Sequence, residues 1–351
     1  MSSKIEKIMQ AGERVLLVGP PGCAKTARIR QAAKNTGIVN VFTYCAGLGE
    51  RVDLAGCYVP DVAAGVTRTL PLDMLDQLSK ATEPTLLFLD DLGAGPIDVQ
   101  AAIKSQITLG GALQKNPNIL VWGATNRPGD KAGVSALCEP LRSEFALAFA
   151  IATPGTDDKP DGATMLGSWK EEVDGWVEWA FDQDADPAVI AWHRSTTGRT
   201  LYQWKPCADP GVRMPDFRSW ATVIRLFKHG MADLSTVGAA IGKPAAAELL
   251  AFVRLADKLP SPEEVWMSPD SAKIPDAGDS SSLYLCAGIL SASVTDKHAG
   301  AFCRYIDRLP RVFGALAGRD AHKRLGAKLT GNREWAKWFL KNEALFAVGA
   351  K

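Results

Sequence analysis

A glycine-rich loop between a short apolar run and a helical stretch constrains this chain more than any other feature. Residues 15–18 are apolar, and helical sequence begins at Lys25 and Thr26. Glycines let backbone N–H groups converge on phosphate oxygens, while the positive end of the helix dipole faces the anion. Lys25 is then placed to reach the β- and γ-phosphates of ATP, and the Thr26 hydroxyl to ligate Mg²⁺. The predicted nucleotide-binding residues are Gly19, Pro20, Pro21, Gly22, Cys23, Ala24, Lys25 and Thr26.

Ala24 departs from the usual phosphate-loop pattern, which has glycine before the lysine. Alanine fits this position if its φ angle stays negative and its methyl group faces away from the nucleotide. The interpretation as a phosphate loop therefore carries a condition on the φ angle of Ala24. Taken alone, the segment also fits an ordinary glycine-rich turn between a strand and a helix.

Two adjacent carboxylates follow a second apolar run. Residues 85–89 read as a buried strand, and Asp90 and Asp91 come directly after it. At the carboxyl end of a parallel strand these side chains lie beside the phosphate loop, in the crevice where such sheets bind ligands. Asp90 is predicted to hold Mg²⁺ through water, because that ion keeps several of its waters. Asp91 is predicted to orient or deprotonate the attacking water. An isolated acidic pair after a strand also fits a solvated loop.

A third strand, residues 119–124, ends in the polar pair Thr125 and Asn126. From this position an amide can touch the γ-phosphate or the attacking water. As a lone feature the pair would be a cap or a turn. Its place after the acidic strand favours a role in the same site.

The chain up to residue 151 alternates between apolar runs and helical patterns. The predicted strands are residues 15–18, 39–44, 85–89, 119–124 and 146–151, each without polar alternation. Such runs fit strands buried on both faces of a parallel sheet, and the alternation with helices indicates a doubly wound α/β fold. Two segments interrupt the rhythm. Residues 53–69 read as a hairpin or loop insertion, and residues 110–117 as a short hairpin.

The composition changes after residue 154, where a polar linker rich in Gly, Pro and Asp begins. Helical patterns follow, and residues 259–282 form a second region rich in Pro, Ser and Asp. We therefore predict an α/β core (1–154), a helical lid (155–258), and a linker with a helical C-terminal extension (259–351). The predicted helices after the core are residues 169–181, 187–195, 215–227, 234–241, 244–257, 283–290, 299–308 and 335–346.

The composition also limits the cellular locations and the classes of binding partner that we expect. The net charge of +1 gives no general attraction to nucleic acid or to an anionic membrane. Seven scattered cysteines without a CxxC pair argue against a disulfide framework or a structural zinc site. The N-terminal residues lack a secretory pattern, and no apolar run is long enough to span a bilayer. We expect a cytoplasmic protein that does not bind a membrane.

Five tryptophans crowd the region before residue 218, and they fit either a surface that stacks on nucleic-acid bases or a packed core. A stacking platform for single-stranded nucleic acid would need interleaved Lys or Arg side chains. Residues 169–181 instead carry four acidic residues. Packing in the core of the lid is therefore the better interpretation of Trp169, Trp176, Trp179, Trp192 and Trp204.

Together these motifs resemble the AAA+ ATPases, and within them the MoxR-like branch. Gly-Pro-Pro-Gly-x-Ala-Lys-Thr, with alanine before the lysine, is typical of that branch. Residues 53–56 with Pro60 and Gly65 resemble the family's insertion after the second strand, and residues 96–102 fit its pattern after the acidic strand. Residues 214–220 resemble the Pro-x-x-Arg-x-Trp segment of its lid. The resemblance covers residues 13–226 well, and residues 245–342 only in their helical character.

The resemblance implies a role for two further polar residues and for the acidic pair. Asn126 corresponds to sensor 1, and Arg218 to sensor 2, a lid arginine that closes on the γ-phosphate. A solvated arginine on a helix is the alternative interpretation of Arg218. Many relatives have glutamate where this chain has Asp91. The shorter side chain is expected to position water less well and to slow hydrolysis.

The arginine that such ATPases supply from a neighbouring subunit is harder to assign. The family usually has arginine directly before phenylalanine, where this chain has Glu144 before Phe145. Arg142 can serve from a shifted position, Arg127 can serve instead, or the arginine is missing. Such an arginine contributes about 10³–10⁵ to the rate of related phosphoryl transfers. We take Arg142 as the candidate.

The family's sites lie between subunits, so the resemblance implies a homo-oligomeric ring, by analogy a hexamer. The ring would bind ATP and Mg²⁺ and remodel a protein client, together with a partner that bears a von Willebrand factor A domain. Two other classes of function stay open. One is a nucleic-acid motor or loader, which the neutral charge disfavours. The other is a nucleotide-gated scaffold that hydrolyses weakly, in keeping with Asp91 and Glu144.

Overall fold

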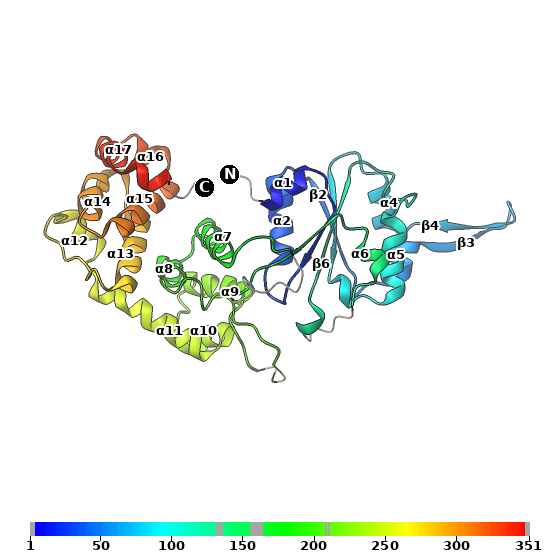
Figure 1. Cartoon of the computed structure of the whole chain (residues 1–351), viewed down its shortest axis with the longest axis horizontal. Coiled ribbons are helices and arrows are strands. Elements are labelled where there is room, and N and C mark those ends of the chain that lie inside the picture. Colours follow the sequence, from blue (N-terminus) through cyan, green and yellow to red (C-terminus); the bar gives the residue numbers. More distant parts are fainter. Residues whose placement is uncertain (1–3, 131–135, 155–163, 208, 210, 348–351) are drawn as a thin grey trace. The chain divides into compact units, whose positions relative to one another are not determined.

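The computed structural model describes residues 4–130, 136–154, 164–207, 209 and 211–347. The chain divides into two compact units (Figure 1). The N-terminal unit comprises residues 1–169 and 204–208, and the C-terminal unit comprises residues 170–203 and 209–351. Each unit is described by itself below.

A five-stranded parallel sheet is the centre of the N-terminal unit. Its order is β2-β5-β6-β1-β7, so β1 lies between β6 and β7. Parallel pairing brings the carboxyl ends of β1, β5 and β6 to one edge of the sheet. These are the five strands predicted from the apolar runs, with ends shifted by at most one residue. Their bounds are β1 Val15–Val18, β2 Asn40–Cys45, β5 Thr85–Asp90, β6 Ile119–Thr125 and β7 Leu147–Ala150.

Helices cover both faces of this sheet (Figure 1). Side chains of α3 to α6 share one buried cluster with the sheet, in which Leu54, Leu78, Ile103 and Leu141 pack with strand residues such as Leu87. α2 contacts β5 and β6, and α1 packs on α2. The bounds are α1 Lys4–Gln10, α2 Lys25–Asn35, α3 Arg51–Ala55, α4 Asp73–Ser79, η1 Leu92–Ala94, α5 Ile97–Ile107, η2 Pro128–Asp130 and α6 Glu139–Arg142.

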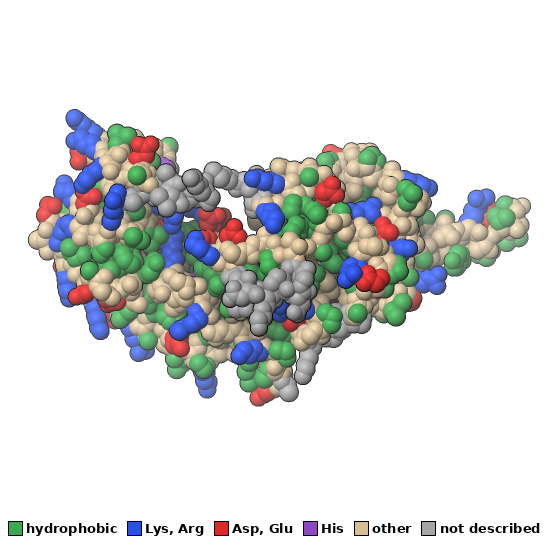
Figure 2. Space-filling model, viewed as in Figure 1, with side chains coloured by type: hydrophobic (Ala, Val, Ile, Leu, Met, Phe, Trp, Pro, Cys, Tyr) green, Lys and Arg blue, Asp and Glu red, His purple; other side chains and the backbone are tan. Residues whose placement is uncertain are grey.

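The insertion after β2 contains a hairpin that projects from the sheet (Figure 1). Its strands are β3 Cys57–Asp61 and β4 Val66–Leu70, paired antiparallel with Cys57 opposite Leu70. All of β4 is exposed, and Tyr58 and Val62 are 71% and 89% exposed. Figure 2 shows hydrophobic and charged side chains together on this hairpin. The hairpin predicted for residues 53–69 is therefore present, preceded by the short helix α3.

The hairpin predicted for residues 110–117 is wrong. These residues form successive turns, and the N–H of Leu113 bonds to the carbonyl of Gln106 at 3.2 Å. Leu113 is 2% exposed, because its side chain belongs to the cluster beneath α5. The segment therefore folds back on the end of α5 instead of pairing with itself.

The described part of the C-terminal unit is helical. Its bounds are α7 Trp169–Asp182, α8 Pro187–Ser195, α9 Phe217–Lys228, α10 Leu234–Ile241, α11 Lys243–Val253, η3 Arg254–Lys258, α12 Pro262–Met267, α13 Ser280–Ser293, η4 Asp296–His298, α14 Ala299–Ile306, α15 Arg311–Leu325, α16 Ala327–Thr330 and α17 Arg333–Ala347.

Three of these α-helices, α12, α15 and the short α16, were not predicted. Within residues 259–282, α12 forms because Ser261 accepts a hydrogen bond from the N–H of Glu264, and Pro262 occupies the first turn. α15 packs on α13 through small buried residues such as Ala317 and Gly318, which give a weak apolar pattern. Arg194 of α8 also forms an ion pair with Asp320 of α15. Segments of the predicted lid and extension thus pack together, and their boundary at residue 258 stays a prediction.

A buried histidine lies in the aromatic core of this unit. His193 is fully buried, and its ring centroid lies 4.5 Å from that of Trp176 and 4.2 Å from that of Trp220, both edge to face. Among the described residues, neither ring nitrogen of His193 has a hydrogen-bond partner. Burial lowers the pKa of His193 to about 3, so the native ring is neutral. Trp176 and Trp192 are buried, as the core-packing interpretation predicted, and Trp179 is half-buried. For Trp169 and Trp204 the interpretation is wrong, because both are half-buried and belong to the N-terminal unit.

The neutral state of His193 predicts a loss of stability in mild acid. Its pKa is about 6.5 when unfolded and about 3 when folded. Below pH 6.5 only the unfolded chain binds the proton, so stability falls as the pH drops toward 3. We expect a loss of about 2 kcal/mol between pH 7 and pH 5 from this group. Urea unfolding, followed by tryptophan fluorescence at both pH values, measures it.

The control for this prediction is the same substitution at an exposed histidine. His193→Phe should reduce the pH dependence by that amount, whereas His229→Phe, on an exposed residue, should leave it unchanged. A His193→Phe protein with the wild-type pH dependence would contradict the assignment.

Candidate functional site

The loop of residues 19–26 joins β1 to α2 at the carboxyl edge of the sheet. The N–H of Gly19 bonds to the carbonyl of Thr125 at 3.2 Å, which ties the start of the loop to β6. Gly19 has no room for a side chain, since a Cβ there would lie 2.8 Å from the Sγ of Cys23 and 3.1 Å from Ile151. Cys23 is fully buried. The loop is therefore packed against the sheet through its own side chains.

The condition that φ of Ala24 be negative is not met. Ala24 has φ 65° and ψ 26°, the left-handed region, and Gly22 has φ 76°. Ala24 is the N-cap of α2, so the chain turns there into the first helical turn. The left-handed conformation costs an L-residue roughly 1–2 kcal/mol. The loop therefore needs the geometry that glycine adopts without strain, and alanine adopts it at a cost.

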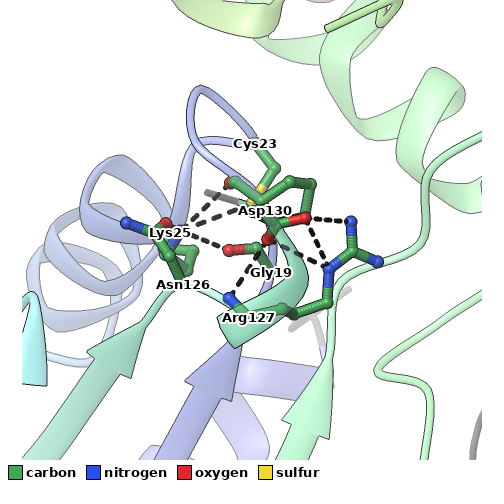
Figure 3. A network of polar contacts seen from close by, with 7 residues as sticks. Gly19, Cys23, Lys25, Asn126, Arg127 and Asp130 are labelled. Atoms are coloured by element: carbon green, nitrogen blue, oxygen red, sulfur yellow. Dashed lines mark hydrogen bonds and ion pairs between the residues drawn. The ribbon is translucent and has the colours of Figure 1, made fainter. Parts of the chain in front are cut away.

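Lys25 connects the loop to β6 (Figure 3). Its side chain is buried, and Nζ donates to the carbonyls of Gly19 at 2.8 Å and Pro20 at 3.1 Å. It also donates to Oδ1 of Asn126 at 2.7 Å. An ammonium has three donors, so these partners satisfy it. The charge is thereby held between the loop and the end of β6.

Thr26 and Asp90 form a second pair at this edge. The Thr26 hydroxyl donates to Oδ2 of Asp90 at 2.8 Å, and Oδ1 of Asp90 accepts from the N–H of Asp91 at 3.0 Å. Mg²⁺ is usually bound by one or two protein oxygens, with phosphate oxygens and waters completing its octahedron. The described residues contain no cluster of three or more potential metal-ligating side chains. A hydroxyl and a carboxylate side by side therefore fit Mg²⁺ bound together with a nucleotide.

Asn126 brings Asp91 into the same network. Its Nδ2 donates to Oδ1 of Asp91 at 3.5 Å, while its Oδ1 accepts from Lys25. Asp91 has φ 50°, a left-handed conformation that aspartate tolerates better than most residues. The structure thus gathers Lys25, Thr26, Asp90, Asp91 and Asn126 from three adjacent strand ends. The arrangement offers a cation, an amide, a hydroxyl and two carboxylates, which suits binding of a phosphate anion and activation of water.

The turn after Asp91 is braced by residues that sequence reasoning missed. The N–H of Gly93 donates to Oγ1 of Thr125 at 3.1 Å, and Nε2 of Gln100 donates to the carbonyl of Gly95 at 2.9 Å. Gly95 approaches Ala46 so closely that a Cβ would lie 2.9 Å from the Ala46 Cβ. The only sequence signal for this role of Gln100 was a polar residue within the apolar pattern of residues 99–103.

The two candidate arginines of the N-terminal unit differ in how they are held. Arg142 pairs with Glu139 at 2.7 Å on the surface, where the two side chains are 61% and 73% exposed. Arg127 instead forks onto Asp130 with N–O distances of 3.0–3.2 Å, and the Asp130 side chain is 8% exposed (Figure 3). Asp130 was missed as a partner because its pairing depends on the turn at η2.

Glu144 and Arg218 complete the set of residues singled out from the sequence. Glu144 accepts from Oγ1 of Thr108 at 2.9 Å and pairs with Arg14 at 3.4 Å, so it links α6 to its own unit. Arg218 is exposed in the first turn of α9, which Asp216 and Ser219 cap reciprocally. Arg218 lies in the C-terminal unit and the phosphate loop in the other, so its role as sensor 2 stays a prediction.

Comparison with known proteins finds similarity mainly in the N-terminal unit. Residues 15–149 match the AAA family, described as "ATPase family associated with various cellular activities". The human ATP-dependent zinc metalloprotease YME1L1 is 30% identical over 193 residues, which are 52% of this chain and 22% of that protein. The outer mitochondrial transmembrane helix translocase of Danio rerio is 29% identical over 134 residues, 35% of this chain and 32% of that protein.

Among solved structures, the Thermotoga maritima RuvB Holliday junction branch migration motor is similar in fold. The alignment covers 77% of this chain and 79% of the RuvB chain. The TM-score is 0.37 and the identity 17%. The chain spans about a fifth to a third of the length of the curated relatives above. The match over residues 15–149 and the five-stranded parallel sheet show the fold of an AAA+ P-loop protein, which is followed by a helical C-terminal region. Within the described residues, no helix is both long enough and apolar enough to cross a bilayer.

The left-handed conformation of Ala24 predicts that glycine stabilises this loop. Ala24→Gly should raise the free energy of unfolding by about 1 kcal/mol, because relief of the strain exceeds the entropy that glycine adds to the unfolded chain. Guanidinium unfolding at fixed temperature measures the change. Ala27→Gly, at an exposed helical position three residues on, should lower it by roughly 0.5–1 kcal/mol. Equal losses in both variants would exclude strain at Ala24.

Proposed function

We propose that this chain is a MoxR-like AAA+ ATPase that binds ATP with Mg²⁺ at the loop of residues 19–26 and hydrolyses it. The observation that carries the proposal is the hydrogen-bonded path from Lys25 through Asn126 to Asp91, beside the pair of Thr26 and Asp90. AAA ATPase domains hydrolyse ATP in general, and these are the groups that this reaction needs.

Each group has a distinct task in the proposed reaction. Lys25 exchanges its bonds to the loop carbonyls for phosphate oxygens and offsets their charge. Thr26 and Asp90 would hold Mg²⁺, which when bound neutralises charge that develops on the phosphates. Asp91 accepts a hydrogen bond from the attacking water and orients it or takes its proton. Asn126 fixes the Asp91 carboxylate through Nδ2 and touches the γ-phosphate or the water as sensor 1.

Two features of this chain support membership of the MoxR-like branch, and a third supports slow hydrolysis. Alanine stands before the loop lysine, and an insertion with a hairpin follows the second strand. The carboxylate at position 91 is one methylene shorter than the usual glutamate, so it reaches water less well. A nucleotide-gated scaffold with weak turnover is therefore the second candidate, and the engagement of Glu144 within its own unit favours it.

We propose further that the sites lie between subunits of a homo-oligomeric ring, a hexamer, with Arg142 supplied from a neighbour. An exposed ion pair three residues apart contributes little, so Arg142 can leave Glu139 for a phosphate at small cost. Arg127 is a poorer candidate, because its departure would leave the carboxylate of Asp130 buried and unpaired. In the C-terminal unit, Arg218 is proposed as sensor 2.

The proposed work of the ring is to remodel a protein client, in concert with a partner that carries a von Willebrand factor A domain. This part rests on the resemblance to the MoxR-like branch alone. We place the protein in the cytoplasm, in keeping with its seven free cysteines. A nucleic-acid motor finds no support in the net charge of +1.

Substitutions at Lys25 and Asp91 should separate ATP binding from hydrolysis. Lys25→Ala should lower ATP turnover by roughly 10²–10³-fold, since it removes the cation of the loop. Asp91→Asn should leave the Kd for ATP within about threefold of wild type and lower kcat by about 10²-fold or more. Steady-state phosphate release and equilibrium nucleotide binding give both quantities. Lys34→Ala, on an exposed lysine of the same helix, is the control and should change neither. Wild-type binding and turnover in Lys25→Ala would refute the central proposal.

Mixing two inactive variants tests whether Arg142 acts on a neighbour. Arg142→Ala should lower kcat by about 10³-fold and leave ATP binding unchanged. Mixed with Lys25→Ala subunits, which still carry Arg142, it should regain turnover, because intact loops then face intact arginines. Glu139→Gln frees Arg142 and should not lower kcat. Failure of the mixture to regain activity would assign the arginine to its own subunit or remove it from the reaction.

A further inference from the structure

Gln100 of α5 has an unusual environment for a glutamine. Its side chain is fully buried, although glutamine is mostly exposed in folded proteins. A buried amide must find hydrogen-bond partners, and both ends of this one do. Nε2 donates to the carbonyl of Gly95 at 2.9 Å, and Oε1 accepts from the N–H of Cys138 at 2.9 Å. The two partners are backbone groups of segments more than 40 residues apart.

The first partner belongs to the turn that carries Asp91. The N–H of Ala94 bonds to the carbonyl of Asp91 at 2.9 Å, and the N–H of Gly95 to that of Leu92 at 3.2 Å. Leu92 of this turn is fully buried in the core of the N-terminal unit. Thr125 holds its middle through Gly93, and Gln100 holds its far end through Gly95.

The second partner begins the helix that carries Arg142. Cys138 is the N-cap of α6, and its carbonyl accepts the N–H groups of Leu141 and Arg142, both at 3.0 Å. The bond from the N–H of Cys138 to Gln100 therefore fixes where this four-residue helix starts. So short a helix is not stable alone, and it depends on such tertiary bonds.

We propose that Gln100 is a positioning residue that joins the turn of Asp91 to the helix of Arg142. The inference rests on the proposed function and deepens it. Gln100 is fully buried, so it acts on the reaction through the two segments that it joins. It holds the Asp91 carboxylate and Arg142 in a fixed geometry within one subunit, so that a movement of either segment displaces the other.

The chain contains a control residue six positions further along the same helix. Nε2 of Gln106 donates to the carbonyl of Leu54 at 2.7 Å, so it makes the same kind of bond, to a residue of α3. Methionine has nearly the length of glutamine and makes neither bond. Gln100→Met therefore removes two side-chain bonds at a place linked to the site, and Gln106→Met removes one at a place that is not.

The expected result is a change in kcat at position 100 alone. Gln100→Met should lower kcat for ATP roughly 10–100-fold, as small misplacements of reacting groups do, with KM within twofold of wild type. Gln106→Met should leave both within twofold. Loss of thermal stability is expected in both variants and does not distinguish them. If the methionine variant does not fold, Gln100→Glu at pH 9 replaces it, because a carboxylate cannot donate to the Gly95 carbonyl.

Double-variant cycles test the link itself. Gln100→Met is combined with Asp91→Asn in one double variant and with Arg142→Ala in another. In each double variant kcat should fall by less than the product of the two single fold-losses, because Gln100 acts through Asp91 and through Arg142. The same combinations with Gln106→Met should be multiplicative. Multiplicative losses for Gln100→Met with either substitution, or a kcat equal to wild type, overturn the inference while the ATPase proposal stands. A wild type that neither binds nor hydrolyses ATP overturns both.

Discussion

The three hydrogen bonds that the Lys25 ammonium donates to oxygen atoms depend on the order of the strands. The loop carbonyls that accept two of them follow β1, and the amide that accepts the third follows β6. These partners meet because β1 and β6 are neighbours in a parallel sheet, with their carboxyl ends at one edge. A different strand order would leave the ammonium with loop partners alone. The acidic strand, which adjoins β6 on its other side, brings its carboxylates to the same place.

Features that depend on local pattern could be predicted from the sequence, and features that depend on distant contacts could not. The five strands, the loop and the carboxylates after β5 follow from short apolar runs with polar ends. The positive φ of Ala24 could not be predicted from the sequence, because the loop geometry imposes it against the preference of alanine. Residues 110–117 fold against α5, and α15 packs through small residues. The role of Gln100 needs two segments that only the folded chain brings together.

Three arginines of the N-terminal unit each pair with an acidic residue. The burial of that acidic residue indicates whether the arginine has a structural role or can leave to bind a phosphate. Asp130 is buried, and the guanidinium of Arg127 neutralises its charge. Glu144 is shared between Arg14 and Thr108, and it anchors the chain after α6 to the N-terminal unit. Glu139, by contrast, is exposed to water, so the pair with Arg142 can open without stranding a buried charge. Burial of the carboxylate, more than the distance of each pair, distinguishes the three.

The hairpin of β3 and β4 can change its sequence without disturbing the fold that carries it. Its residues contribute almost nothing to the buried clusters, and its turn is closed locally by Asp61, which accepts from the N–H of Ala64 at 3.0 Å. Gly65 completes this turn with φ 65°. Mutations there escape the packing constraints that hold the sheet edge fixed. Evolution can therefore vary the tip of this hairpin while the candidate site at the sheet edge stays the same.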